Sequence, residues 1–305
     1  MRMAYISLKY KLMIEDRICR LKKFFISDEK YAKNKYYKIK KEKLNLSNPE
    51  TFSEKLQYLK LHYRNPLLEL CADKYYCREY VASCGFENIL KEVYYVCNDV
   101  KEIDLAKLPQ KSFVRWNHMS GGNFIFDKKN SKKNKEVIEL LSVYQKFDWY
   151  YHGREWQYHH IQPKLLFEEY LSNEDGSLLR DYKFYCFNGE VKYYMVSFGE
   201  FEHKHVNHKF DKNHQSIDKF FKQNETISAS KINLPFNIGE MLQIAEVLSK
   251  PFPHVRVDMY NLNGRIVFGE MTFFSNGGFV NIESNDFDKK IGSWINIEKY
   301  KSDLR

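Results

Sequence analysis

Several features that identify common protein classes are missing from this sequence of 305 residues. Its 7 Pro and 13 Gly are too few for a collagenous or low-complexity chain, and its 43% hydrophobic content is too high for a disordered one. No run approaches the roughly 18 uninterrupted apolar residues that a membrane-spanning helix needs. The composition therefore predicts a globular protein that buries its core in one large domain or two closely joined ones.

The six cysteines contain no pair at Cys-x-x-Cys spacing, and the N-terminal residues lack the apolar stretch and cleavage site of a signal peptide. We therefore expect a reduced, cytoplasmic protein. His203, His205 and His208 lie close in sequence, but no cysteine or His-Glu-x-x-His frame completes a zinc site around them. The Gly-x-Ser-x-Gly, Walker and Rossmann glycine motifs are absent, so no motif in the sequence specifically supports a hydrolase, a phosphate-loop protein or a dinucleotide-binding protein.

Positive charge is concentrated at the N-terminal end of the chain. Residues 1–65 hold 17 Lys or Arg against 7 Asp or Glu and thus account for the net charge of +9. We interpret 1–65 as a basic helical arm ahead of a core over 66–305, and expect no nucleic-acid partner because the arm has no nucleic-acid motif. The segment over 8–25 mixes apolar and basic residues, so it either packs on its own domain or makes a peripheral contact with the inner face of the cell membrane.

The aromatic content of 16% favours a fold that contains β-strands, and the apolar pattern agrees. In the first third, Thr51 and Glu54 have the spacing of a capping box at the start of a helix. From about residue 110 the pattern changes to short strands, predicted over 111–116 and 123–126 around a turn of small and polar residues. Asn188-Gly189 is a strong hairpin signal. These features predict an α+β protein with a helical N-terminal region.

The last predicted hairpin carries two carboxylates, Asp258 and Glu270, followed by the hydroxyl of Thr272. A connecting loop with an odd number of residues would place both carboxylates on one face, as diagonal neighbours roughly 7 to 8 Å apart if the loop has five residues; an even loop would separate them. Carboxylates on an exposed sheet face are common. These strands are strongly apolar, however, so their carboxylates need a partner, and hard oxygen ligands of this kind suit Mg²⁺.

The turn over 117–122 can present successive backbone N–H groups to a phosphate, with Arg115 on the preceding strand as a fixed positive charge. A plain β-turn is the other interpretation. Lys183, on a predicted strand beside Asp181, is either a phosphate or nucleotide contact or a solvated lysine.

An ordered set of sequence blocks resembles the TupA-like ATP-grasp family, which is named for teichuronopeptide synthesis. The resemblance covers roughly residues 30 to 300. In chain order, the blocks are NPETFSEKLQYLK (48–60), ADKY (72–75), REYV (78–81), NH and SG (117–121), FEEYL (167–171), DYKFYCFNG (181–189), RVDMY (256–260) and FGEMTF (268–273).

This resemblance implies an ATP-grasp fold, in which two subdomains, about 110–165 and 166–305, hold ATP between antiparallel sheets. It implies Mg²⁺ at Asp258, Glu270 and Thr272, with Arg256 as a clamp on the substrate carboxylate or acyl phosphate. The resemblance also implies which residues contact the nucleotide. The phosphates would be bound by Arg115, Asn117, His118, Ser120, Gly121 and Gly122, and the adenine by Glu168, Glu169 and Tyr170. Asp181 would lie near the ribose, and Lys183 would contact the nucleotide or the acyl phosphate. Two positions depart from the family pattern: Arg115 stands where a lysine is expected, and Met119 where glycine is usual.

The activity implied is that of an ATP-dependent carboxylate-amine ligase, working through an acyl phosphate in the biosynthesis of a surface polysaccharide such as capsule, O-antigen or teichuronopeptide. Its partners would be a small-molecule amine and a carboxylate-bearing sugar or glycan. Three alternatives stay open: another ATP-dependent transfer, a glycosyltransferase that uses a nucleotide sugar, and a non-catalytic binding module. The absence of an Asp-x-Asp motif counts against the glycosyltransferase.

Overall fold

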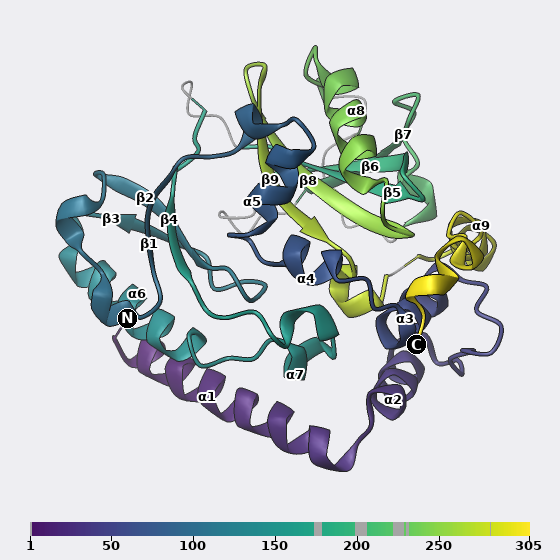
Figure 1. Ribbon diagram of the computed structural model, residues 1–305, viewed down its shortest axis with the longest axis horizontal. Coiled ribbons are helices and arrows are strands. Elements are labelled where there is room, and N and C mark those ends of the chain that lie inside the picture. The colour runs from purple at the N-terminus through teal and green to yellow at the C-terminus, as the bar shows by residue number, and fades with distance from the viewer. Residues whose placement is uncertain (1, 174–178, 199–205, 222–228, 230–231, 281) are drawn as a thin grey trace. The chain divides into compact units, whose positions relative to one another are not determined.

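Figure 1 shows the computed structural model, which describes residues 2–173, 179–198, 206–221, 229, 232–280 and 282–305, with side chains from residue 7 onward. The chain divides into two compact units. The first holds Met1–Tyr31, Glu69–Arg78 and Lys91–Leu171, and the second holds Ala32–Leu68, Glu79–Leu90 and Ser172–Arg305. This division differs from the predicted arm over 1–65, because the helices of that segment bury their apolar residues in two different cores.

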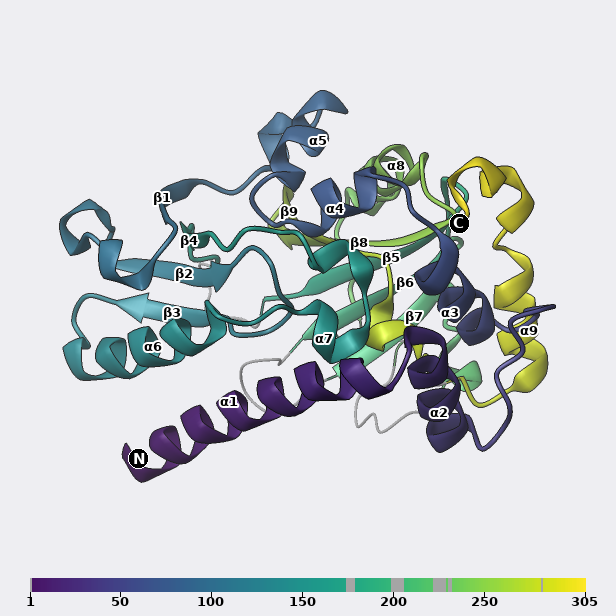
Figure 2. The ribbon, with the colours of Figure 1, turned by 60° about the horizontal axis from the view of Figure 1, so that its bottom comes forward.

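The first unit contains a four-stranded antiparallel sheet in the order β1-β4-β2-β3. Its core gathers around Trp116, which is fully buried and donates its indole N–H to the Leu141 carbonyl at 3.0 Å. Helix α1 packs along α6 and α7, as both ribbon views show (Figures 1 and 2). The elements of this unit are α1 (Arg2–Phe25), β1 (Val93–Cys97), β2 (Lys111–Trp116), β3 (Phe124–Asp127), α6 (Ser131–Tyr144), α7 (Tyr150–Gly153) and β4 (Leu165–Glu168).

The second unit contains a five-stranded antiparallel sheet in the order β7-β6-β5-β8-β9. Helix α8 covers one face of this sheet with Met241, Ile244 and Leu248, whose spacing of three and four residues places them on one side of the helix. The elements are α3 (Phe52–His62), β5 (Asp181–Phe187), β6 (Glu190–Phe198), β7 (Val206–Asp211), α8 (Ile238–Ser249), β8 (His254–Leu262), β9 (Arg265–Thr272) and α9 (Asn285–Ser293).

Three short helices, α2 (Asp28–Lys40), α4 (Leu67–Ala72) and α5 (Cys77–Ser83), contain residues of both units. In the second unit, Ala32 and Tyr36 of α2 are buried in a cluster with Leu44 and Phe279. No helix among the residues that the structure describes has both the length and the apolar character needed to cross a bilayer.

The predicted α+β class with antiparallel sheets is confirmed, and so are the local signals behind it. The Thr51 hydroxyl accepts the Glu54 amide at 3.2 Å, while the Glu54 carboxylate accepts the Thr51 amide at 3.0 Å, which completes the capping box at α3. Asn188 and Gly189 form the β5–β6 turn with φ values of 50° and 91°, both in the left-handed region that this type of turn requires.

Candidate functional site

The β8–β9 hairpin brings Asp258 and Glu270 directly opposite each other on adjacent strands. Only two residues, Asn263 and Gly264, separate the last strand pair, Leu262 and Arg265. The loop is therefore even, and an even loop was expected to separate the carboxylates. That expectation is wrong here because a one-residue bulge shifts the register between Asp258 and Met259 and returns both carboxylates to one face.

The extra residue of this bulge is Gly269, which the register skips between the pairs Met259–Phe268 and Asp258–Glu270. A Cβ at Gly269 would lie 2.9 Å from the carbonyl oxygen of Asp258, closer than non-bonded carbon and oxygen atoms approach. The bulge therefore depends on glycine at this position, because the two backbones come too close for a side chain.

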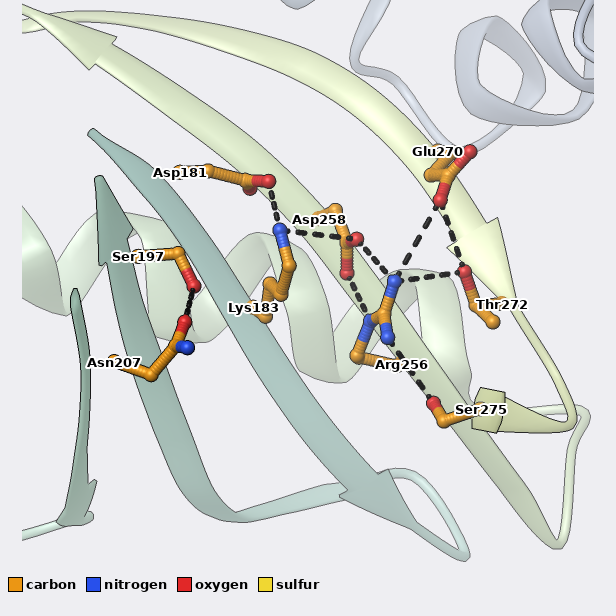
Figure 3. A network of polar contacts seen from close by, with 9 residues as sticks. All are labelled: Asp181, Lys183, Ser197, Asn207, Arg256, Asp258, Glu270, Thr272 and Ser275. Carbon is orange, nitrogen blue, oxygen red and sulfur yellow. Dashed lines mark hydrogen bonds and ion pairs between the residues drawn. The ribbon is translucent and has the colours of Figure 1, made fainter. Parts of the chain in front are cut away.

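Arg256 joins the carboxylates into a network on this face of the sheet, shown in Figure 3. Its Nε and Nη2 donate to Asp258 Oδ1 and Oδ2 at 2.7 and 2.6 Å, which forms a two-pronged ion pair. Its guanidinium also donates to Thr272 Oγ1 at 3.1 Å and to Ser275 Oγ at 3.2 Å, and lies 3.6 Å from Glu270 Oε1. Ser275 begins a short 3₁₀ helix after β9, and the sequence analysis missed it because nothing in its local sequence indicates a polar contact.

Lys183 extends the network to the neighbouring strand β5, where it is the pairing partner of Asp258. Its ammonium group donates to Asp181 Oδ2 and lies 3.8 Å from Asp258 Oδ2 (Figure 3). Lys183 and Asp181 are both buried, because β5 is a central strand that is covered on both faces. The structure thus brings together the residues predicted for ribose, nucleotide, metal and substrate contacts within this unit.

Burial controls the titration of these groups. It raises the pKa of Asp258, against the opposing effect of the Arg256 and Lys183 charges. Burial acts to lower the pKa of Arg256, but the Asp258 charge and hydrogen bond, together with Tyr185 and Glu270, hold it above its ordinary value. A positive charge is therefore permanently held beside the carboxylates.

The donor set on this face matches what Mg²⁺ takes. Two carboxylates and the Thr272 hydroxyl share one side of the hairpin, and the Glu270 side chain is 34% exposed. Each Asp258 oxygen accepts one bond from Arg256, and a carboxylate oxygen has a further acceptor site. Among the residues that the structure describes, no three His, Cys, Asp or Glu side chains are grouped so that they could hold a metal ion by themselves. Water and phosphate oxygens would complete the shell, as is usual for Mg²⁺.

In the first unit, Arg115 and Glu168 lie on paired strands and bind each other. Arg115 Nε lies 2.7 Å from Glu168 Oε2, Nη2 donates to Oε1 at 3.0 Å, and Lys91 donates to Oε2 at 3.0 Å. Burial acts to raise the pKa of Glu168, but the two cations outweigh it and bring the pKa to about 2. The sequence analysis treated Arg115 and Glu168 as separate nucleotide contacts and missed Lys91, which has no motif to mark it.

The turn over 117–122 connects β2 and β3, as predicted, but its two halves differ. Asn117 is buried, donates to Asp73 Oδ2 at 2.8 Å and accepts the Lys164 amide at 2.6 Å, so its amide group holds the turn in place. His118 is also buried, and burial, with the Lys74 charge, lowers its pKa to about 4, so it is neutral at pH 7.

The second half of the turn is accessible. Ser120 and Gly121 are exposed and Gly122 is half-buried, and both glycines have positive φ values of 76° and 65°. Met119 precedes them with its side chain in the core cluster and its carbonyl bound to Lys74 at 2.6 Å. The methionine that departs from the family pattern therefore anchors the base of this turn.

Other predicted residues lie outside both networks. Glu169 and Tyr170 follow β4 and are half-buried, and the Glu169 amide donates to the Glu92 carbonyl at 2.9 Å. His203 and His205 lie outside the described residues, and His208 binds Asp218 at 2.7 Å. A cavity of about 660 Å³ in the second unit contains none of the predicted residues in its lining, which includes Arg180, Tyr182, Phe236 and Asn261.

Comparisons with known proteins identify a family. The family model described as TupA-like ATPgrasp matches residues 54–296. No curated protein matches the chain.

Similar solved structures include D-alanine–D-alanine ligase from Bacillus anthracis, with 18% identity, a TM-score of 0.48, and coverage of 79% of this chain and 71% of that chain. The same ligase complexed with ATP has 15% identity, a TM-score of 0.48, and coverage of 79% and 70%. The D-alanine–D-alanine ligase from Helicobacter pylori has 13% identity, a TM-score of 0.44, and coverage of 85% and 70%.

Proposed function

Because the chain belongs to the TupA-like ATP-grasp family, we propose that it is an ATP-dependent ligase that joins a carboxylate to an amine in the biosynthesis of a surface polysaccharide. The observation that carries this proposal is the pairing of Asp258 with Glu270 across the β8–β9 hairpin, beside the fixed charges of Arg256 and Lys183. Such a face offers carboxylates to a divalent cation and cations to a phosphate.

In the proposed reaction, an oxygen of the substrate carboxylate attacks the γ-phosphorus of ATP, and the bond from that phosphorus to the β–γ bridging oxygen breaks. The products of this step are an acyl phosphate and ADP. The amine nitrogen then attacks the acyl carbon, the bond from that carbon to the phosphate oxygen breaks, and phosphate leaves as the nitrogen loses a proton. Mg²⁺, held by Asp258 and Glu270 with Thr272 beside them, would neutralise phosphate charge when bound.

The side chains of the chain have distinct tasks in this proposal. Lys183 supplies a buried positive charge to the nucleotide or acyl phosphate, and Asp181 orients its ammonium group. Arg256 holds both oxygens of Asp258 and adds positive charge where the acyl phosphate forms. In the first unit, the accessible residues Ser120 to Gly122 offer backbone N–H groups to phosphate.

The test compares nucleotide binding and turnover in matched variants. We expect Mg·ATP to raise the melting temperature of the wild-type protein and of Glu190→Gln, an exposed carboxylate of the same sheet, but not that of Glu270→Gln. Asp258→Asn and Glu270→Gln should both abolish ATP-dependent turnover. Unchanged turnover in both variants would reject the assignment of the site.

The reaction type is tested by its products. With a panel of amino acids and uronate-containing glycans, the proposal expects release of ADP together with an amide product. Release of AMP would contradict the acyl-phosphate route. A thermal shift with Mg·UDP-sugar and none with Mg·ATP would replace the ligase by a glycosyltransferase.

A further inference from the structure

Helix α1 has a packed face and an exposed apolar face. On the packed face, Leu12 and Met13 lie against the core of the first unit. Asp16 contacts His152 at 3.1 Å and Arg20 at 2.7 Å, and Arg20 also donates to the Lys146 carbonyl at 2.7 Å. These contacts fix which side of the helix faces the protein.

The other face of α1 carries large apolar side chains that the first unit leaves uncovered. Tyr10 is 60% exposed, Ile14 56% and Leu21 58%, and Phe24 and Phe25 are 83% and 82% exposed. Positions 10, 14, 18, 21 and 25 recur every three or four residues, so they form one continuous stripe along the helix. The stripe from Tyr10 to Phe25 therefore extends about 24 Å at 1.5 Å per residue.

The charge of α1 indicates what covers this stripe. The helix contains seven Lys or Arg and two Asp or Glu. Asp16, one of the two acidic residues, is buried on the packed face, whereas Arg17 and Lys22 are exposed beside the stripe. Neither of these two cations forms an ion pair with a residue that the structure describes. An apolar stripe edged by free positive charge complements an anionic bilayer surface.

We propose that the outer face of α1, formed by Tyr10, Ile14, Ile18, Leu21, Phe24 and Phe25, lies on a membrane that contains anionic phospholipid. The aromatic and aliphatic side chains enter the boundary between headgroups and acyl chains. The long stems of Arg17 and Lys22 carry their charges to the phosphates. A groove in another protein fits less well, because a protein partner would have to cover a straight helix along its full length and also neutralise its free charges.

The first experiment measures binding of the full chain to vesicles by co-sedimentation. We expect at least tenfold tighter binding to vesicles with about 30% phosphatidylglycerol than to pure phosphatidylcholine, and weaker binding at high salt. Phe24→Gln/Phe25→Gln should weaken binding at least tenfold, and Arg17→Gln/Lys22→Gln roughly tenfold. The matched control Leu105→Gln/Phe236→Gln removes two apolar side chains that are 52% and 87% exposed elsewhere, and should bind like wild type.

The second experiment places a reporter on the stripe. Phe24→Trp keeps a large aromatic ring, and its fluorescence should shift to shorter wavelength with anionic vesicles if the ring enters the bilayer. Wild-type protein that does not sediment with anionic vesicles would overturn the proposal, and so would equal binding by the Phe24→Gln/Phe25→Gln variant. A wild-type dimer that this variant converts to a monomer, without vesicle binding, would assign the face to a second copy instead. None of these results depends on the ligase proposal.

Discussion

Replacing Glu168 with Gln tests the buried cluster of the first unit. The substitution keeps the size of the side chain but removes the negative charge that both Arg115 and Lys91 contact. All three side chains are at most 8% exposed, so water cannot replace the lost partner. Removing one member of such a buried ion cluster leaves the remaining charges uncompensated, which is the costly case for buried ion pairs.

The size of the effect follows from the titration of Glu168. Its pKa is about 2 in the fold against an ordinary 4.5, and each pKa unit corresponds to about 1.4 kcal/mol. We therefore expect Glu168→Gln to lower the free energy of unfolding at pH 7 by about 3 kcal/mol. Lys91 limits this cost. Burial and the Arg115 charge already lower its pKa to about 8, and without Glu168 it releases its proton more readily.

Urea unfolding followed by tryptophan fluorescence is the assay, because three of the four tryptophans, Trp116, Trp149 and Trp156, belong to this unit. The folded pKa of Glu168 is depressed, so its contribution is complete above pH 4.5 and is lost as the pH falls towards 2. The free energy of unfolding of wild type should fall over that range, and that of Glu168→Gln should fall by about 3 kcal/mol less.

The variant should also show a new dependence on pH around neutrality. Because its Lys91 titrates below pH 8, the stability of the variant relative to wild type should rise with pH in this range. Glu139→Gln is the matched control, since this exposed partner of Lys9 should change stability by less than about 1 kcal/mol. A Glu168→Gln protein within about 1 kcal/mol of wild type at pH 7 would refute this reasoning.

Three further predictions address the bulge, the arginine and the turn. Gly269→Ala should destabilise the protein by about 1–3 kcal/mol in thermal denaturation and abolish the Mg·ATP shift, whereas Gly239→Ala, in open space on α8, should stabilise it by up to about 1 kcal/mol. Arg256→Lys keeps the charge but loses the two-pronged contact with Asp258, so turnover should fall about tenfold or more; wild-type turnover would exclude a role for the fork. The pKa of His118 is about 4 in the fold, so the free energy of unfolding that depends on its neutral form is lost as the pH falls below 6.5. In urea unfolding between pH 7 and 5, the free energy of unfolding of His118→Phe should therefore fall by about 2 kcal/mol less than that of wild type. An equal fall would contradict that pKa.

The candidate site was only partly predictable from the sequence. Asp258, Glu270 and Thr272 were identified from the alternation of apolar and polar residues within two strands, and Lys183 from the same kind of pattern, whereas the role of Arg256 came only from the resemblance to the family. Ser275 was missed, since its contact with Arg256 depends on how the chain turns after β9. Lys91 was missed for a similar reason, because 77 residues separate it from Glu168 and no local pattern reports their contact.

The sequence by itself determined the local elements: the capping box at Thr51, the tight turn at Asn188-Gly189, and the strands on either side of that turn. These signals act through neighbouring residues, so they do not need the rest of the fold. Only the tertiary structure decided which side chains meet. The bulge at Gly269 places Asp258 and Glu270 on one face, where a regular hairpin with a two-residue loop would separate them. It depends on glycine, because the backbones of the two paired strands approach too closely there for a side chain. The grouping of residues 1–31 and 32–68 into different units likewise depends on cores assembled from distant segments.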